Sequence, residues 1–385
     1  MKHHFPLEHI EGVRTPFYYY DLPLLQQTLD AMQIAIADCP YFHIHYAVKA
    51  NANDELLRFV HQANLGCDCV SGGEVQAALD AGFAPDKIVF AGVGKADWEI
   101  ELALRAGIFC FNVESEAELQ VIHSIAQGMK KKAPVAIRVN PNVDAHTHHY
   151  ITTGLNENKF GVSLNQLPQV VALAQSLDHV DLLGLHFHIG SQLLDMRPFI
   201  ALCERINTLQ ETFDQQGITF QHINVGGGLG IDYDHPDQNP IPNFDGYFKV
   251  FKKHLKLRPN QEVHFELGRA IMGQIGSLIS RVLYVKQGEN KQFVILDAGM
   301  SDLIRPALYQ AHHHIENITP SNPNEIFVYD VVGPVCESSD TFGKEISLPL
   351  TQRGDLVALR SAGAYGQIMA SQYNCRPLPK AVYKK

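Results

Sequence analysis

Eight short apolar segments, most of them followed by an amphipathic helical pattern, constrain the fold of this chain more than any other feature. Alternating strands and helices favour right-handed crossovers and a parallel sheet. Eight such units close a (β/α)8 TIM barrel, and a span of about 250 residues is usual for that fold. A doubly wound open sheet is the alternative, but that fold does not require eight strands. The predicted strands are Ile44–Val48, Cys67–Val70, Ile88–Ala91, Phe109–Val113, Val135–Val139, Leu183–His188, His222–Val225 and Val263–Glu266.

The pattern changes after about residue 273, where β-segments separated by turns replace the helices. An aromatic strand, Phe17–Tyr20, lies near the N-terminus and has no barrel partner, so we expect it to join these later strands. The sequence therefore predicts an α/β chain of two domains. Residues 23–273 form the barrel, and residues 1–22 with 274–385 form an all-β domain of sandwich or barrel-like type.

Composition excludes several classes of partner. The 31 Lys and Arg and 41 Asp and Glu give a formal net charge of −10, without acidic or basic blocks. This argues against nucleic acid and against an anionic membrane surface. The start MKHHFPLEHI has no apolar stretch of signal-peptide length, and no later apolar run is long enough to cross a bilayer. Seven scattered cysteines are typical of reduced thiols, so we expect a cytoplasmic protein.

Polar residues follow the ends of the predicted strands, where the active site of a barrel lies. A lysine at the mouth of a buried strand can become an imine-forming amine, because desolvation lowers its pKa. A solvated strand-end lysine is the alternative. The strand-end residues of interest are Lys49, Arg138, His186, His188, Ser191, Gly226–Gly230, Glu266, Gly268 and Arg269.

The glycine run Gly226–Gly230 predicts a phosphate site. Glycines let backbone N–H groups approach an anion, and barrels often bind phosphate after strands seven and eight. It is no dinucleotide fingerprint, because Ile231 stands where the third glycine is required. A lysine, a phosphate site and the carboxylate of Glu266 together fit pyridoxal phosphate, whose ring nitrogen commonly faces an acid. An ion pair between Glu266 and Arg269 is the structural alternative.

The pair His186 and His188 lies on one face of its strand, a spacing that also serves catalytic metals. A metal needs further histidines or aspartates at neighbouring strand ends, and Lys49 and Arg138 stand there instead. We therefore predict no metal, a cofactor-stacking role for His188 and a core position for His186. The run His312–His314 lies in a helical pattern that cannot present three rings to one site, and it receives no role.

Three stretches of the β domain carry reactive or charged side chains. Cys336 and Glu337 are adjacent in a turn-rich segment, and Arg305 and Tyr309 stand four residues apart, so both can point the same way. Tyr365 lies in a run of small residues. Each is unremarkable alone, since a free cysteine usually behaves as a small apolar side chain.

Seven motifs in order make this chain resemble the alanine-racemase-type (fold type III) pyridoxal-phosphate decarboxylases: YAVKAN, HFHIGSQ, GGGLG, ELGR, DLIRPALY, GPVCESSD and AGAYG. The resemblance runs from about Pro16 to Pro379. It implies decarboxylation of an amino acid, most closely of meso-2,6-diaminopimelate to L-lysine in lysine biosynthesis. Leu267 departs from the usual proline or serine of the E-x-G-R motif, which puts only the local turn in doubt.

The resemblance also implies roles for individual residues. Lys49 forms the Schiff base, His188 stacks on the ring, Glu266 faces the pyridinium nitrogen, and Cys336 donates the proton. A homodimer is implied, in which Cys336 and Glu337 complete the site of the partner subunit. Cofactor contacts are expected from Arg138, Ser191, Gly227, Gly228, Gly268, Arg269 and Tyr365. Substrate contacts are expected from Arg269, Arg305, Tyr309, Glu337 and Tyr365.

Charge counting supports this substrate, because its far end carries an ammonium for Glu337 and a carboxylate for Arg305. A polyamine-pathway decarboxylase of the same fold, acting on carboxynorspermidine, ornithine or arginine, is the first alternative. An amino-acid racemase on the same barrel is a further one. From another class, a metal-dependent barrel hydrolase would use His186 and His188.

Overall fold

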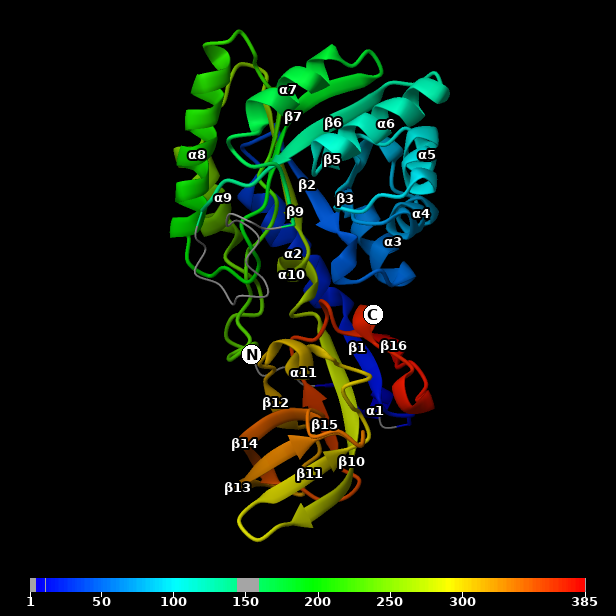
Figure 1. Ribbon diagram of the computed structural model, residues 1–385. Coiled ribbons are helices and arrows are strands. Elements are labelled where there is room, and N and C mark those ends of the chain that lie inside the picture. Colours follow the sequence, from blue (N-terminus) through cyan, green and yellow to red (C-terminus); the bar gives the residue numbers. More distant parts are fainter. Residues whose placement is uncertain (1–4, 11, 144–158, 385) are drawn as a thin grey trace. The chain divides into compact units, whose positions relative to one another are not determined.

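The computed structural model describes residues 5–10, 12–143 and 159–384 (Figure 1). The chain divides into two compact units. The barrel unit contains Asp30–Gly230 and Asn243–Gly268, and the β unit contains Met1–Leu29, Ile231–Pro242 and Arg269–Lys385. Residues 231–242 thus group with the β unit, although they lie inside the predicted barrel range. The domain boundaries at 22/23 and 273/274 stay a prediction.

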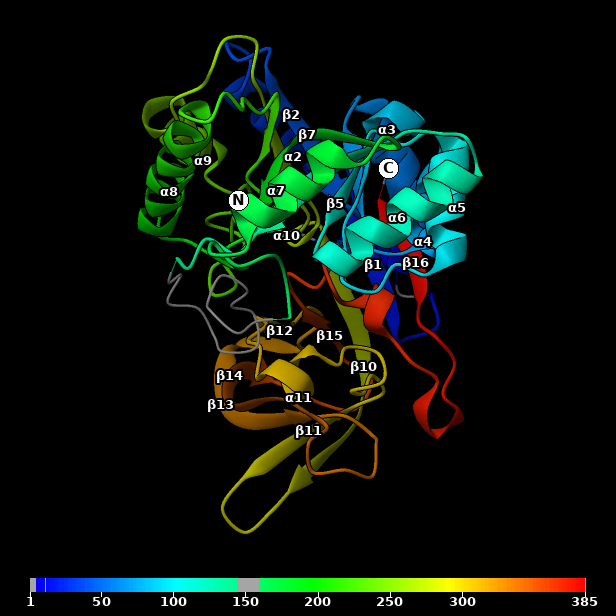
Figure 2. The ribbon, with the colours of Figure 1, turned by 45° about the horizontal axis from the view of Figure 1, so that its top comes forward.

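Eight parallel strands close the barrel in sequence order, and β9 pairs with β2 to complete the ring. Helices α3 to α9 lie outside these strands (Figures 1 and 2). The strands are β2 (Phe42–Ala47), β3 (Gly66–Cys69), β4 (Ile88–Phe90), β5 (Cys110–Val113), β6 (Ala133–Val139), β7 (Val180–Phe187), β8 (His222–Asn224) and β9 (Glu262–Leu267). The helices are α2 (Leu22–Ala35), α3 (Asp54–Gln62), α4 (Gly72–Asp80), α5 (Asp97–Ala106), α6 (Glu116–Gly128), α7 (Leu167–Ser176), α8 (Arg197–Asp214) and α9 (Phe244–His254).

Short polar residues start the helices that follow the strands. The side chains of Asn53, Ser71 and Ser115 accept hydrogen bonds from backbone N–H groups in the first turns of α3, α4 and α6. Such caps satisfy donors that would otherwise have no partner, and each contributes about 1 kcal/mol. They therefore fix where the chain turns from strand to helix.

Alternation along β9 separates an inner from an outer face. Phe265 packs on Tyr247 and Phe251 of α9, with ring centroids 5.9 and 5.1 Å apart. Since strand side chains alternate, Glu262, His264 and Glu266 point to the barrel interior. The side of this strand that faces the barrel interior is therefore polar at both of its ends.

The β unit contains a sheet in the order β12-β15-β10-β11-β13-β14, with β1 pairing to β10 and β16 pairing to β1. These strands are β1 (Phe17–Asp21), β10 (Gly276–Gln287), β11 (Gln292–Leu296), β12 (Ile315–Asn317), β13 (Asn322–Val332), β14 (Thr341–Leu350), β15 (Leu356–Leu359) and β16 (Lys380–Lys384). The short helices are α1 (Leu7–Ile10), α10 (Arg269–Met272) and α11 (Arg305–Tyr309).

The predicted fold class is confirmed, including the entry of the N-terminal strand into the β domain. Predicted barrel strands agree with the structure within three residues. The helical pattern assigned to His312–His314 is wrong: α11 ends at Tyr309 because Gln310 adopts a left-handed conformation (φ 53°), and the three histidines precede β12.

None of the helices within residues 5–10, 12–143 and 159–384 has the length and apolar content to cross a bilayer.

Candidate active site

Lys49 lies one residue beyond the end of its predicted strand. It belongs to a 3-10 turn, Val48–Ala50, that directly follows β2. Its Nζ is 3.1 Å from Oδ2 of Asp68 on β3, and 39% of its side chain is exposed. The amine is therefore held at the carboxyl end of the barrel while it stays open to a ligand.

Asp68 is a site residue that the sequence analysis missed. Its side chain is fully buried, and Oδ1 has no hydrogen-bond partner within the part of the chain that the structure describes. Burial, assisted by the nearby carboxylate of Glu266, raises the pKa of Asp68 to about 7, although Lys49 opposes the shift. An acid that changes protonation near neutral pH thus lies beside the amine.

This raised pKa predicts a pH-dependent stability. The folded protein binds more protons at Asp68 than the unfolded chain does between about pH 4 and about pH 7. The contribution of Asp68 is therefore fully present below about pH 4 and is lost as pH rises through about 7. Asp68→Asn removes this loss, so its free energy of unfolding relative to wild type should rise by about 2 kcal/mol from pH 5 to pH 7. Urea unfolding of the cofactor-free protein measures it.

The exposed Asp178 supplies a control, because Asp178→Asn should track wild type at both pH values. An Asp68→Asn difference that stays constant with pH would contradict the raised pKa.

Glu266 is buried on the inner face of β9, surrounded by donors. Its Oε1 accepts from Nδ2 of Asn112 at 3.0 Å and of Asn224 at 2.7 Å, and Oε2 lies 3.0 Å from Nε2 of His186. Burial alone would raise the pKa of Glu266, but His186, which also bonds to the carboxylate, and Lys49 lower it well below its ordinary value. The carboxylate is therefore ionised and oriented.

The two histidines of β7 and its exit have different environments. His186 is buried and bonded to Glu266, so it supports a carboxylate instead of only filling the core. His188 is partly buried beside Arg138 and Lys49, and desolvation followed by these two charges lowers its pKa well below the ordinary value. A neutral ring results, which suits stacking on an aromatic ligand.

Arg138 lies on β6 and forms a buried ion pair. Its Nη1 donates to Oε1 of Glu114 at 2.7 Å, and its guanidinium lies 4.8 Å from the ring centroid of Phe160. Glu114, which the sequence analysis also missed, accepts further bonds from the backbone N–H groups of Gly92 and Gly161. This network fixes the direction of the arginine side chain.

The glycine run after β8 has a structural reason of its own. A Cβ at Gly227 would lie 2.0 Å from the carbonyl oxygen of Glu266, and Gly226 has φ +70°. A Cβ at Gly228 would lie 2.8 Å from the carbonyl oxygen of Gly190. Close backbone packing thus requires these glycines, so their number alone does not identify a phosphate site.

Within the β unit, two arginines converge on Tyr233. Nη1 of Arg305 donates to Tyr233 Oη at 3.0 Å, and Nη1 of Arg269 donates to the same oxygen. Burial would raise the pKa of Tyr233, but the two guanidinium groups lower it below its ordinary value. Arg269 also lies 4.9 Å from the ring centroid of Tyr365. Two predicted residues, Arg269 and Arg305, therefore converge on a tyrosine that the sequence analysis overlooked, and a third, Tyr365, lies beside one of them.

His313, to which no role was given, holds Arg305. Its Nδ1 lies 2.9 Å from the carbonyl oxygen of Arg360, and its Nε2 lies 3.2 Å from Arg305 Nη1. Burial, followed by the charge of Arg305, lowers the pKa of His313 to about 3. The neutral ring therefore donates from Nδ1 to the carbonyl and accepts from Arg305 at Nε2. Tyr309 ends the same short helix, α11, that Arg305 begins.

The remaining predicted residues lie in loops. Cys336 and Glu337 are both exposed between β13 and β14, and Glu337 accepts a hydrogen bond from Tyr373 Oη. Ser191 lies in the loop after β7. Gly268 follows β9, where a Cβ would crowd Ala50 and Ala47 at 3.0 and 3.1 Å. Leu267 is the last residue of β9 and pairs with Tyr46, so it continues the strand.

The donor set of the barrel unit fits pyridoxal phosphate. A partly exposed amine, an ionised buried carboxylate and a neutral, partly buried imidazole are side chains of the kinds that this cofactor uses. The orphaned Oδ1 of Asp68 leaves one further polar atom to be satisfied beside Lys49. The barrel and its site thus define a class, the pyridoxal-phosphate enzymes built on a (β/α)8 barrel.

Comparison with known proteins agrees with this class. Residues 25–273 match the family described as "Pyridoxal-dependent decarboxylase, pyridoxal binding domain". The chain belongs to the pyridoxal-dependent decarboxylase family, and pyridoxal phosphate is its cofactor. Family membership favours cofactor chemistry over the metal-dependent hydrolase considered above.

Within this family, the chain is similar to proteins of one particular activity. A diaminopimelate decarboxylase of Bacteroides thetaiotaomicron is 60% identical over 99% of this chain and 98% of its own length. That of Vibrio cholerae is 46% identical over 94% and 86%. The crystal structure of diaminopimelate decarboxylase from Helicobacter pylori complexed with L-lysine superposes with a TM-score of 0.92 at 43% identity, covering 98% of this chain and 93% of that one.

Proposed function

We propose that this chain decarboxylates meso-2,6-diaminopimelate to L-lysine and carbon dioxide. The observation that carries the proposal is the 60% identity over nearly the whole chain to a diaminopimelate decarboxylase. The buried guanidinium of Arg305 supports it, because the distal carboxylate of this substrate is matched by such a partner.

When bound, pyridoxal phosphate supplies a ring that withdraws electrons from the substrate α-carbon. We propose that Lys49 attaches this cofactor and that Asp68 orients the amine. Glu266, held by Asn112 and Asn224, accepts a hydrogen bond from the pyridine N–H, and its lowered pKa keeps it charged for that task.

The other contacts are proposed from the same resemblance. His188 covers the ring, and Arg138, held by Glu114, contributes positive charge at the carboxyl end of the barrel. The phosphate is assigned to Ser191, Gly227, Gly228, Gly268 and Arg269, with a contact from Tyr365.

We assign the far end of the substrate to the β unit. Arg305 binds the distal carboxylate with help from Tyr309, and Glu337 binds the distal ammonium. Tyr233 and His313 position Arg305 from two sides, since both bonds to the guanidinium are within 3.2 Å. Substrates without the distal carboxylate leave this guanidinium unpaired, which is the basis of selection.

We further propose a homodimer in which Cys336 and Glu337 complete the site of the partner subunit. The exposure of both residues in one protomer supports this arrangement. Cys336 then delivers a proton to the substrate α-carbon after carbon dioxide leaves. The described cysteines are all free thiols, which supports the proposed cytoplasmic location.

Cys336→Ala is expected to retain bound cofactor but to slow turnover by about 10²–10⁴-fold, the usual contribution of a positioned proton donor. Carbon dioxide release and lysine formation measure this loss. Cys375→Ala is the matched control, because Cys375 is also an exposed free thiol of the β unit. Normal turnover of Cys336→Ala would remove this thiol from the reaction.

A substrate panel tests the function itself. We expect carbon dioxide release from meso-diaminopimelate to exceed release from ornithine, arginine and carboxynorspermidine by about 10⁴-fold in kcat/KM. A preference for any of the other three substrates would instead identify a polyamine-pathway decarboxylase.

A further inference from the structure

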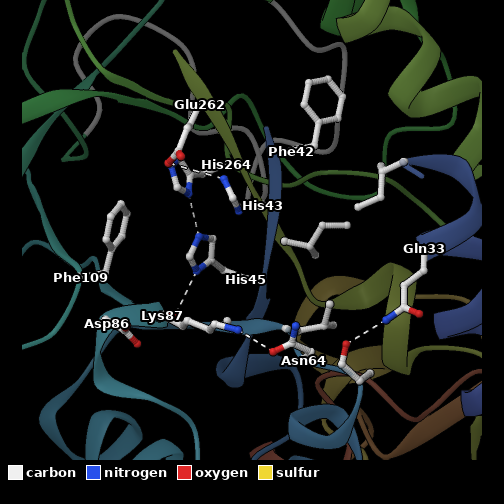
Figure 3. A pocket seen from close by; sticks show the side chains of 15 residues that line it. Gln33, Phe42, His43, His45, Asn64, Asp86, Lys87, Phe109, Glu262 and His264 are labelled. Carbon is white, nitrogen blue, oxygen red and sulfur yellow. Dashed lines mark hydrogen bonds and ion pairs between the residues drawn. The ribbon is translucent and has the colours of Figure 1, made fainter. Parts of the chain in front are cut away.

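Four histidines and one glutamate gather at the amino-terminal ends of three barrel strands, opposite the ends that carry Lys49 and Glu266. His43 and His45 come from β2, His222 from β8, and Glu262 and His264 from β9. Figure 3 shows most of this group at a cavity of about 440 Å³ whose lining includes Phe109 and Lys87. No role proposed above uses any of these five side chains.

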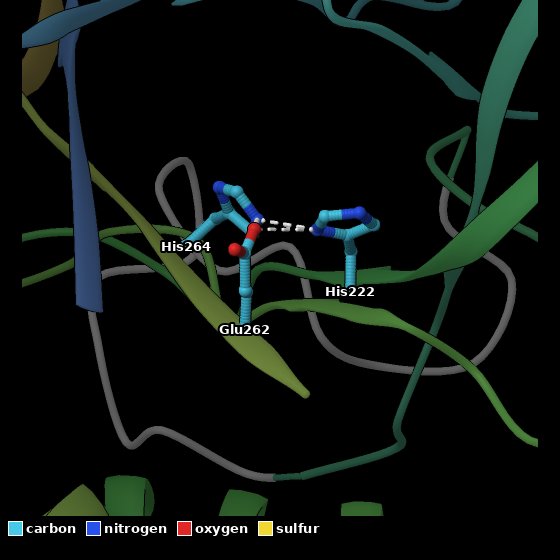
Figure 4. A group of neighbouring side chains, drawn as sticks. All are labelled: His222, Glu262 and His264. Carbon is cyan, nitrogen blue, oxygen red and sulfur yellow. Dashed lines mark hydrogen bonds and ion pairs between the residues drawn. The ribbon is translucent and has the colours of Figure 1, made fainter. Parts of the chain in front are cut away.

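Three of these side chains place donor atoms close together (Figure 4). Nδ1 of His222 is 3.0 Å from Nε2 of His264 and 3.3 Å from Oε2 of Glu262, and the last two atoms are 4.0 Å apart. Bonds of about 2.0–2.1 Å at tetrahedral angles hold donor atoms about 3.3 Å apart. The observed triangle therefore has the size that one metal ion requires, and it is the metal-sized group found among the described residues.

A chain of hydrogen bonds orients the nitrogen of His264. His45 Nδ1 lies 3.1 Å from the carbonyl oxygen of Lys87, so in the neutral ring it carries the proton and donates. Nε2 of His45 then accepts from Nδ1 of His264 at 2.9 Å. The lone pair of His264 is consequently at Nε2 and points at His222 and Glu262. Metal-binding histidines are commonly oriented by such bonds to a carbonyl oxygen or a second side chain.

His43 lies beside the group and contacts two of its members. Its Nε2 is buried, has no hydrogen-bond partner among the described residues, and lies 3.5 Å from Oε2 of Glu262. The His43 ring stacks on His264 at a centroid distance of 5.1 Å. It is not one of the three residues whose donor atoms lie within the size of a single ion, so it lines the site without being counted as a ligand.

The charge of the group suits a cation. Histidine binds a metal through its neutral ring, and Glu262 supplies one negative charge. Glu262 is 43% exposed, so an ion has a path to the site from solvent.

We propose that His222, His264 and Glu262 bind a divalent transition-metal ion of the zinc class. Imidazole and carboxylate donors suit Zn²⁺, Co²⁺ and Ni²⁺. The ion links the neighbouring strands β8 and β9 and so stabilises the end of the barrel opposite the catalytic groups. The prediction of no metal considered only the pair His186 and His188 and did not consider this end of the barrel.

The test uses untagged, cofactor-loaded protein freed of metal by a chelator. Added Zn²⁺ is expected to bind with one ion per chain at this site and to raise the thermal midpoint by about 2 °C or more. A zinc-soaked crystal should show an anomalous peak between His222, Glu262 and His264. His222→Gln and Glu262→Gln, both changes of partly exposed side chains, should weaken Zn²⁺ binding by about 100-fold or more.

The control is His61→Gln, which changes an exposed histidine of α3 and should bind Zn²⁺ like wild type. Equal Zn²⁺ affinity in wild type, His222→Gln and Glu262→Gln, or an anomalous peak only elsewhere, would overturn the proposal. So would an absence of binding to wild type, which would leave the group as a hydrogen-bonded cluster. Circular dichroism of each variant separates loss of the site from loss of the fold.

Discussion

Lys49→Ala is expected to abolish decarboxylation of meso-diaminopimelate, with kcat falling by about 10⁴-fold or more. Lys49 is the amine placed beside a buried acid at the carboxyl end of the barrel, and its removal leaves the cofactor without a covalent attachment. Carbon dioxide release measures activity. Borohydride reduction followed by mass spectrometry measures attachment, because wild type should gain one pyridoxal phosphate at Lys49 and the variant none.

Lys256→Ala is the matched control, since Lys256 forms an exposed ion pair with Glu211 in the same unit. It should keep both activity and the reduced adduct. Persistent covalent attachment in Lys49→Ala, at another lysine, would contradict the assignment. Loss of both activity and adduct in Lys256→Ala would show that the two measurements report folding.

The barrel could be predicted because its signals are local. A buried parallel strand is a short apolar run, and eight such runs, most of them followed by a helix, indicate the barrel. Lys49 and Glu266 could be placed for the same reason, as each stands at the end of such a run. Their partners could not. Asp68 faces Lys49 because strands β2 and β3 pair, and Asn112 reaches Glu266 only because the sheet closes into a ring.

The β unit shows the same limit. Tyr233 is more than 30 residues from Arg269 in sequence and lies in a segment without regular structure, so no periodicity points to it. His313 was assigned to a helical pattern, whereas the left-handed Gln310 ends the helix and turns the ring toward Arg305. Side-chain pairs of this kind depend on tertiary packing and not on local propensity.

The spacing of the histidines at the opposite end of the barrel could have indicated a further site, but it was not interpreted in the sequence. His43 and His45 form an H-x-H pair on the first strand, as His186 and His188 do on the sixth. Only barrel closure brings His264 beside both His45 and His222, with donor atoms 2.9 and 3.0 Å apart. Residue spacing within one strand therefore indicates which side chains share a face of that strand. How many of them can bind one ion depends on the neighbouring strands.

Arg305→Met is expected to lower kcat/KM for meso-diaminopimelate by about 10³–10⁴-fold, because a site built to bind a charged group loses that binding when the partner is absent. The guanidinium is buried and held by Tyr233 and His313. Arg305 is the one cation of the described helix α11, so no other residue of that helix can replace it. Methionine keeps much of the side-chain length. Activity on ornithine, which lacks the distal carboxylate, should change by less than about tenfold, so the preference between the substrates should largely disappear.

Two further variants separate charge from packing. Arg353→Met changes an exposed arginine of the same unit and should leave both substrates unaffected. His313→Gln removes one support but keeps Arg305, so KM for meso-diaminopimelate should rise while kcat stays within about threefold. If Arg305→Met lowered turnover of both substrates equally, the guanidinium would support the fold or the cofactor and not the distal carboxylate. A selective loss would instead place substrate choice in this arginine, positioned by a histidine that stays neutral across the neutral range because burial and the charge of Arg305 lower its pKa to about 3.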